Sequence, residues 1–95
     1  MKPKDKKARF AALSDLGCII CQCPTEIHHL LGLKYSGIAQ KSKDEFTIPL
    51  CVNHHRGEEG IHHIGIKTWQ YKYGTQEYLL ELTNIHLGRE FGAGL

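Results

Sequence analysis

The sequence has no long apolar run. No stretch of its 95 residues approaches the roughly 20 apolar residues that a membrane-spanning helix needs. The first ten residues, MKPKDKKARF, are basic but lack the apolar core of a secretory signal. We therefore expect a cytoplasmic protein with no membrane partner.

Aromatic residues are also few, and the chain is short. Only 8% of the residues are aromatic, and a chain of this length buries little more than about 60% of the surface that its unfolded form exposes. Such a marginal core calls for support by metal or disulfides. Because disulfides rarely persist in a reducing cytoplasm, the four cysteines and seven histidines favour metal.

The net charge is small as well. A formal charge of +2 is too low to indicate a nucleic-acid partner by itself. Basic residues are nevertheless concentrated in residues 1–9, which hold four lysines and Arg9 against a single acid, Asp5. A basic arm of this kind can follow a phosphate backbone. A solvated helix start or a frayed end explains it equally well.

Local patterns predict a small α+β domain. Phe10, Leu13 and Leu16 recur at helical spacing, Gly17 suits a helix C-cap, and Thr75 suits an N-cap. No repeat or long linker divides the chain, so residues 1–95 form one domain. We expect helices at 6–16 and 75–87, helical turns at 51–56 and 67–73, strands at 26–30 and 46–50, a loop at 31–44 and a loose tail at 88–95.

Two spaced pairs of metal-ligand residues stand out. Cys18 and Cys21 form a CxxC pair, and Cys51 and His54 form a CxxH pair thirty residues later. Two such turns are what a tetrahedral structural zinc site needs. We assign these four residues to a structural zinc and expect Cys23 to be a spare. The alternative is a set of thiols that binds no metal.

The remaining histidines suggest a second centre. His28 and His29 lie on the first predicted strand, His55 follows a zinc ligand, and His62 follows a GEEG turn. We assign His29 as a general base and His28, His55 and His62 as ligands of a catalytic divalent metal. Phosphodiester cleavage needs both a base to activate water and a cation to hold the phosphate and the leaving oxygen.

The identity of this metal follows from the ligand types. Three imidazoles favour zinc or another transition metal, whereas a shell rich in oxygen suits magnesium or manganese. On a regular strand His28 and His29 point to opposite faces, so both reach one site only if the strand ends or twists there. His63 and His86 are expected to be a neighbour of the site and a structural residue, respectively.

These blocks together resemble a known family. GCIICQ, EIHHL, TIPLCVNHHR and GIHHIGIKTWQYKYGTQEYLLEL are similar to the HNH-superfamily phage nucleases related to Ref, the RecA-dependent recombination-enhancement nuclease. The resemblance covers residues 17–87. It implies a ββα-metal (HNH) fold, a DNA endonuclease activity and a phage or prophage origin in a bacterial host, with the same assignment of zinc ligands, catalytic ligands and base.

The sequence departs from this family pattern in two places. HNH proteins usually carry an Asn on the second strand, but the corresponding KDEFTIP segment has none. Asp44 or Thr47 is the candidate replacement that orients the base. The long basic N-terminal region of Ref is also missing, so RecA-coated DNA is only a further candidate partner beside DNA itself.

Several residues are candidate DNA contacts. Arg56 follows the ligand His55, and its guanidinium fork suits a scissile phosphate. Lys34, Lys41 and Lys43 are candidate backbone contacts or ordinary solubility charges. Aromatic residues at 69, 71 and 73 are candidate stacking platforms, with the tryptophan favoured as core. The rival function is a non-catalytic zinc module that binds DNA or a protein.

Overall fold

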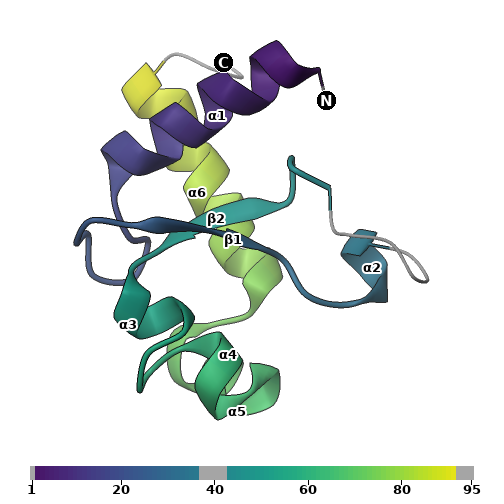
Figure 1. Cartoon of the computed structure of the whole chain (residues 1–95), viewed down its shortest axis with the longest axis vertical. Helices are drawn as coiled ribbons and strands as arrows, with labels where there is room; N and C mark the ends of the chain where they lie inside the picture. The colour runs from purple at the N-terminus through teal and green to yellow at the C-terminus, as the bar shows by residue number, and fades with distance from the viewer. Residues whose placement is uncertain (1, 37–42, 92–95) are drawn as a thin grey trace.

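A two-stranded sheet lies between two groups of helices (Figure 1). The computed structural model describes residues 2–36 and 43–91. In Figure 1, α6 (Gln76–Phe91) begins behind the sheet and runs to the end where α1 (Pro3–Leu16) lies, and α3, α4 and α5 lie toward the other end. The Cα radius of gyration, 12.8 Å, is close to the value of about 12 Å expected for a compact domain of this length. The chain is thus a small α+β domain.

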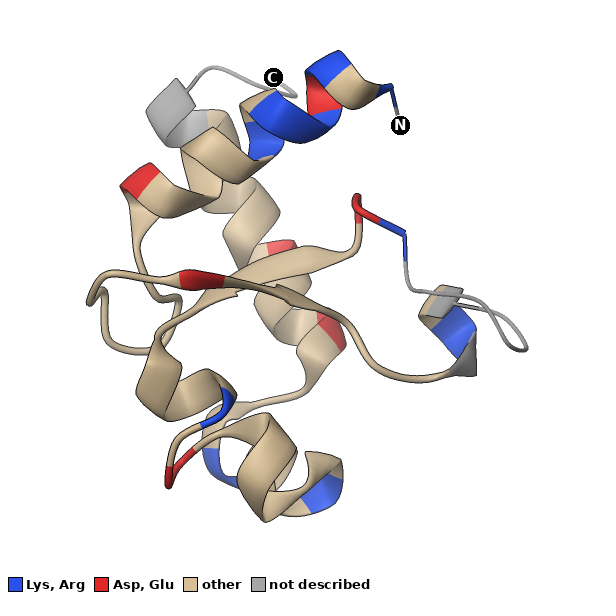
Figure 2. Cartoon of the chain, viewed as in Figure 1, with Lys and Arg blue, Asp and Glu red and all other residues tan. Residues whose placement is uncertain are grey.

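Helix α1 begins within the basic segment, so of the two explanations for that segment the helix start is confirmed. Residues 3–9 are helical, because Pro3 is pre-organised for a first helical turn and Arg9 anchors the helix. The Arg9 guanidinium donates from Nε to Thr47 Oγ1 (2.9 Å), from Nη2 to the Thr47 carbonyl (2.7 Å) and from Nη1 to Asn84 Oδ1 (3.0 Å). Figure 2 shows blue basic residues on the outer turns of α1. Arg9 therefore serves the fold rather than a flexible arm.

The last helix begins as predicted but ends later. Thr75 caps it, since Thr75 Oγ1 accepts a hydrogen bond from the Tyr78 amide at 3.0 Å. The helix includes residues 88–91, which were expected to be loose. Packing against α1 and the burial of Leu87 (6% exposed) outweigh the low helix propensity of Gly88. Residues 92–95 of the expected tail lie outside the described residues.

In the two-stranded sheet, β2 contributes to the core and β1 carries two of the histidines predicted for the site. Strand β1 (Glu26–His29) pairs antiparallel with β2 (Thr47–Leu50), so that His28 lies opposite Ile48 and His29 lies opposite Thr47. All four residues of β2 are buried. Strand β1 has one edge that no other strand covers in the described part of the chain.

Four short helices follow or separate these elements. The predicted loop at 31–44 contains α2 (Leu33–Ser36), and its residues 37–42 lie outside the described residues. After β2 come α3 (Val52–His55), α4 (Ile61–Ile64) and α5 (Ile66–Tyr73). The sequence analysis had not predicted α4. The buried core comprises Cys18, Leu30, Ile48, Leu50, Cys51, Ile61, Trp69 and Leu79.

Two cysteines thus belong to the hydrophobic core, and Trp69 is fully buried, as expected. Trp69 also donates from Nε1 to the His54 carbonyl at 3.1 Å, which ties α5 to α3. None of the described helices is both long and apolar enough to cross a membrane.

Candidate metal centres

Two groups of side chains are placed to hold a metal ion, and the first contains the four predicted zinc ligands. Cys18 and Cys21 come from the turn after α1, Cys51 follows β2, and His54 lies on α3. The turn is tight at Gly17, where a Cβ would lie 2.7 Å from the Gln22 carbonyl oxygen. A backbone hydrogen bond from Ile19 N to Pro49 O (2.9 Å) joins this turn to β2.

The distances within this group fit a tetrahedral ion. Cys21 Sγ lies 3.6 Å from Cys51 Sγ, and His54 Nδ1 lies 3.2 Å from Cys51 Sγ and 3.8 Å from Cys18 Sγ. Bonds of zinc to sulfur and nitrogen would place neighbouring ligand atoms about 3.6 to 3.8 Å apart. Four ligands at these separations close the coordination sphere.

The surroundings of the four residues favour a cation at their centre. Burial raises the pKa of the Cys18 thiol, so a thiolate there needs a nearby positive charge. Cys23 is exposed and lies outside the group, in agreement with its expected role as a spare.

The second group joins three histidines from three elements. His28 on β1, His55 on α3 and His62 on α4 have ligand atoms that all lie within 4.8 Å of one another. Their ring centroids are 4.8 to 5.3 Å apart. Gly60 permits this approach, because a Cβ there would lie 2.5 Å from the His55 carbonyl carbon. The glycine lets the start of α4 pass directly over the end of α3.

Two of these rings form hydrogen bonds with side chains outside the group. His28 Nε2 lies 3.0 Å from Gln76 Oε1, and His55 Nδ1 lies 3.0 Å from Glu26 Oε1. Arg56 and His55 hold the pKa of Glu26 at about 2, so Glu26 is an ionised acceptor and His55 Nδ1 donates to it. His55 Nε2 then carries its lone pair. Metal-binding histidines commonly have such outer partners.

Burial disfavours the charged form of two of these three rings, His28 and His62. Burial lowers the pKa of His28 to about 4, although the hydrogen bond to Gln76 acts in the opposite direction. Burial also lowers the pKa of His62, with a smaller effect from His55. His28 Nδ1 is buried and has no hydrogen-bond partner in the structure. A neutral imidazole with a bare lone pair is what a metal ligand requires.

His29 lies apart from the three histidines. Its Nε2 is 2.8 Å from Asp44 Oδ1, and its ring meets Phe10 of α1 edge-on at 6.0 Å. His29 alternates with His28 across the pleat of β1, as a regular strand requires. His29 first, and then the charge of Lys6, lower the pKa of Asp44. Of the two candidates for orienting the base, Asp44 therefore contacts it, whereas Thr47 bonds to Arg9 and Asp44.

The predicted DNA contacts have partners of their own. Arg56 donates from Nε and Nη2 to both oxygens of Glu26, at 2.8 to 3.1 Å. Lys34 pairs with Glu77 at 2.6 Å, and Lys43 is exposed. Lys41 lies outside the described residues. The Arg56 Nη1 group is left outside the pairing with Glu26.

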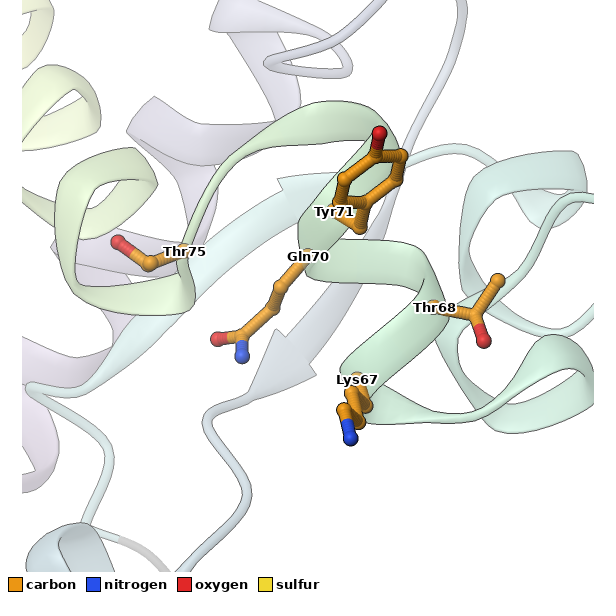
Figure 3. Close-up of a pocket in the computed structure, with 5 residues that line it drawn as sticks. All are labelled: Lys67, Thr68, Gln70, Tyr71 and Thr75. Atoms are coloured by element: carbon orange, nitrogen blue, oxygen red, sulfur yellow. The ribbon is translucent and has the colours of Figure 1, made fainter.

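A shallow pocket adjoins α5 (Figure 3). Its volume is about 520 Å³, and Lys67, Thr68, Gln70, Tyr71 and Thr75 line it. The ring of Tyr71 is 92% exposed. Gln70 Oε1 accepts a hydrogen bond from the Gln76 amide at 2.9 Å, so this pocket lies next to the residue that holds His28.

Two residues that support the second group, Glu26 and Gln76, were not predicted from the sequence. Glu26 shares a strand face with His28 because they are two residues apart, and this spacing could have identified it. Gln76 contacts His28 across 48 positions, and no local pattern marks such a contact.

The fold and sites define a class of protein: a small α+β domain that carries one closed and one three-histidine group, each placed to bind a metal ion. A family model described as "Protein of unknown function (DUF968)" matches residues 3–90. The chain belongs to this family.

One curated relative also matches nearly the whole chain. The chain is 31% identical over 93 residues to "Uncharacterized protein YdfU" of Escherichia coli (strain K12). The match covers 97% of this chain but 24% of the relative, so the chain spans about a quarter of that protein. No solved structure matches.

Proposed function

We propose that this chain is a metal-dependent DNA endonuclease of the HNH (ββα-metal) type. The observation that carries the proposal is the three-histidine group, in which His28 and His55 have hydrogen-bonded outer partners and His62 is exposed to solvent. Three protein ligands leave coordination positions for water and a phosphate oxygen. The order of elements, two antiparallel strands followed by a short helix, agrees with a ββα-metal arrangement.

The closed group has a different role in this proposal. Cys18, Cys21, Cys51 and His54 hold a structural zinc, whose binding free energy is also folding free energy. The zinc fastens the turn after α1 to the start of α3. It thereby sets His55, the residue next to His54, against β1.

The second metal would polarise the phosphodiester and stabilise the leaving 3′ oxygen when bound. His28, His55 and His62 hold it, and three imidazoles favour zinc or another transition metal, with manganese or magnesium as alternatives. Glu26 keeps His55 oriented.

His29 is the general base of the proposal. Asp44 holds Nε2 of the ring, which leaves Nδ1 to take a proton from the attacking water. His28 and His29 are neighbours on a strand with an uncovered edge. A phosphodiester lying along that edge would be reached by the metal from one face and by His29 from the other.

The DNA would be held by basic side chains and by one aromatic ring on α5. Arg56 beside His55 is the candidate contact for the scissile phosphate, Lys34 and Lys43 are candidates for the flanking backbone, and Tyr71 is the candidate stacking platform. A bacterial cytoplasm, a phage or prophage origin and a RecA-coated DNA partner belong to the proposal too.

A matched pair of variants on α4 tests the proposal. His62→Ala should keep one zinc per chain and the native circular dichroism spectrum but lose the second metal. Plasmid nicking, assayed with zinc, manganese and magnesium, should fall by more than about 100-fold, because several kcal/mol of charge stabilisation disappear. The control is His63→Ala, since His63 is exposed and lies next to His62 but outside the group.

Two results would overturn the proposal. One is a wild-type chain that binds a single zinc and cuts no DNA with any of the three metals; this would favour the non-catalytic zinc module. The other is a His62→Ala chain that nicks plasmid as fast as the His63→Ala control.

A further inference from the structure

Gln76 is a buried polar residue at the first position of α6, and both its side-chain oxygen and its side-chain nitrogen form hydrogen bonds. It is 3% exposed. Its Oε1 accepts a hydrogen bond from the Leu31 amide at 2.9 Å, and its Nε2 donates to the Leu31 carbonyl at 3.0 Å. A buried amide with this many bonds is strongly fixed in place.

The pair of hydrogen bonds to the Leu31 backbone determines the orientation of the Gln76 side-chain amide. The Leu31 N–H needs an acceptor and the Leu31 C=O needs a donor, so the oxygen and nitrogen of Gln76 cannot exchange places. The atom that faces His28 Nε2, 3.0 Å away, is therefore the oxygen. An oxygen with no hydrogen can only accept.

This orientation fixes the tautomer of His28. A neutral imidazole has one N–H and one bare nitrogen, and here Nε2 must carry the hydrogen. The bare nitrogen is Nδ1, the buried atom without a partner. His55 and His62 are the side chains whose ligand atoms gather with that of His28.

We infer that Gln76 is a positioning residue that selects the Nε2–H tautomer of His28 and so directs the Nδ1 lone pair to the second metal. The inference rests on the proposed metal site for its purpose, but the tautomer itself is a property of the chain without that metal. Through Gln76, the start of α6 becomes part of the metal centre.

The hydrogen-bonding needs of Leu31 and His28 explain why residue 76 carries an amide rather than a carboxylate. A glutamate would still accept from His28 and from Leu31 N–H, but it would leave the Leu31 carbonyl without its donor. An apolar residue of the same length would release both Leu31 and His28. Glutamine alone serves the backbone and the ring together.

The first experiment reads the tautomer directly. Long-range ¹H–¹⁵N spectra of the histidine rings are recorded on the full chain with only the four-ligand site filled with zinc. In the wild type, the His28 resonances should show a protonated Nε2 and a bare Nδ1. Gln76→Met should give a mixture of tautomers or the opposite one.

The second experiment measures Co²⁺ binding to the same one-zinc protein by calorimetry. Gln76→Met should weaken binding by about 10- to 100-fold, the usual effect of losing an outer partner of a ligand. Gln76→Glu keeps the acceptor, so it should retain the tautomer and bind Co²⁺ within about threefold of the wild type, even if its Tm falls.

Gln70→Met is the matched control for folding. It removes the hydrogen bond to the Gln76 backbone amide and leaves the bond between Gln76 and His28 intact. A lower Tm with unchanged Co²⁺ affinity is expected for it.

The possible results separate the inference from the proposed function. A wild-type His28 with its proton on Nδ1, or a folded Gln76→Met chain that binds Co²⁺ as tightly as the wild type, overturns the role of Gln76. A wild type that shows the Nε2–H tautomer but binds no Co²⁺ overturns the proposed function and leaves the control of the tautomer by Gln76 standing.

Discussion

The two metal groups share helix α3 but have different designs. His54 and His55 are consecutive. His54 belongs to the closed group with the three cysteines, whereas His55 belongs to the three-histidine group, called the open group below. Consecutive residues on a helix point about 100° apart, so one short helix serves both. The closed group combines two core cysteines, Cys18 and Cys51, with the exposed Cys21 and with His54. The open group is built from neutral imidazoles supported by a carboxylate and an amide.

This difference separates stability from chemistry. The closed group offers four ligands and leaves no position for a substrate, so a metal bound there would only hold the fold. The open group has three ligands and an exposed member. Its outer partners, Glu26 and Gln76, add orientation rather than closure. Changes in the two groups should therefore have different consequences.

The largest effect is expected in the closed group. Cys51→Ala should abolish the folded state at 25 °C, because structural zinc supplies about 10 to 16 kcal/mol of apparent binding free energy, more than the whole stability of a typical small domain. Far-UV circular dichroism and one-dimensional NMR should show the loss. Cys23→Ala, a change of the exposed cysteine outside the group, should leave both spectra native.

Two observations would contradict a structural role for the closed group. One is a folded Cys51→Ala chain with a native spectrum. The other is a Cys23→Ala chain that loses its zinc, which would make Cys23 a ligand.

The second effect concerns acid stability and belongs to the open group. The folded-state pKa of His28 is about 4, below its ordinary value of 6.5, chiefly because the ring is buried. The unfolded chain thus binds the proton more tightly. The stabilising contribution is complete above about pH 6.5 and is lost as the pH falls toward 4. At 1.36 kcal/mol per pKa unit, it amounts to about 3 kcal/mol.

This contribution is measured as a difference between two chains. Urea unfolding of the one-zinc wild type and of His28→Asn is followed at several values from pH 7.5 to pH 4.5. The wild type should lose stability relative to His28→Asn as the pH falls. His86→Asn, which changes a histidine of α6 outside the group, should follow the wild type. Parallel curves for the wild type and His28→Asn would contradict the prediction.

Features that depend on residues close together in the chain could be predicted from the sequence. The CxxC and CxxH spacings predicted the four closed ligands, because each pair occupies a single turn. Three local signals, namely the HH pair on the first strand, the position next to the predicted ligand His54, and the GEEG turn, predicted His28, His55 and His62, which gather in the open group. Thr75 and Gly17 were identified as caps from their residue types alone.

Contacts that depend on tertiary placement could not be predicted. Arg9 looks like one more basic residue of a flexible end until β2 and α6 provide its partners. Gln76 has no chemical signature before α6 is placed beside β1. The sequence also indicated that His28 and His29 would point to opposite faces of a regular strand, and the regular register of β1 keeps them there.

A third and smaller effect concerns the base. Asp44→Asn should reduce the rate of plasmid nicking by about tenfold, because the amide is a weaker acceptor for His29 and can present its NH₂ to the ring instead. Metal content should not change, since Asp44 contacts neither group. Glu45→Gln is the matched control, one residue away and exposed. Equal rates for the two variants would mean that Asp44 does not orient the base.

The smallest effect is expected at Tyr71, beside the α5 pocket. Tyr71→Ala should weaken binding of single-stranded DNA by about threefold to tenfold, since stacking of one base on an aromatic ring contributes about 1 to 3 kcal/mol and is partly offset by water at an exposed ring. Fluorescence anisotropy with a labelled oligonucleotide measures it at two salt concentrations. Tyr78→Ala is the control, because Tyr78 is 56% exposed on α6 and does not line the pocket. If Tyr71→Ala binds like Tyr78→Ala, the substrate contacts only the charges around the open group, and the α5 pocket plays no part in holding DNA.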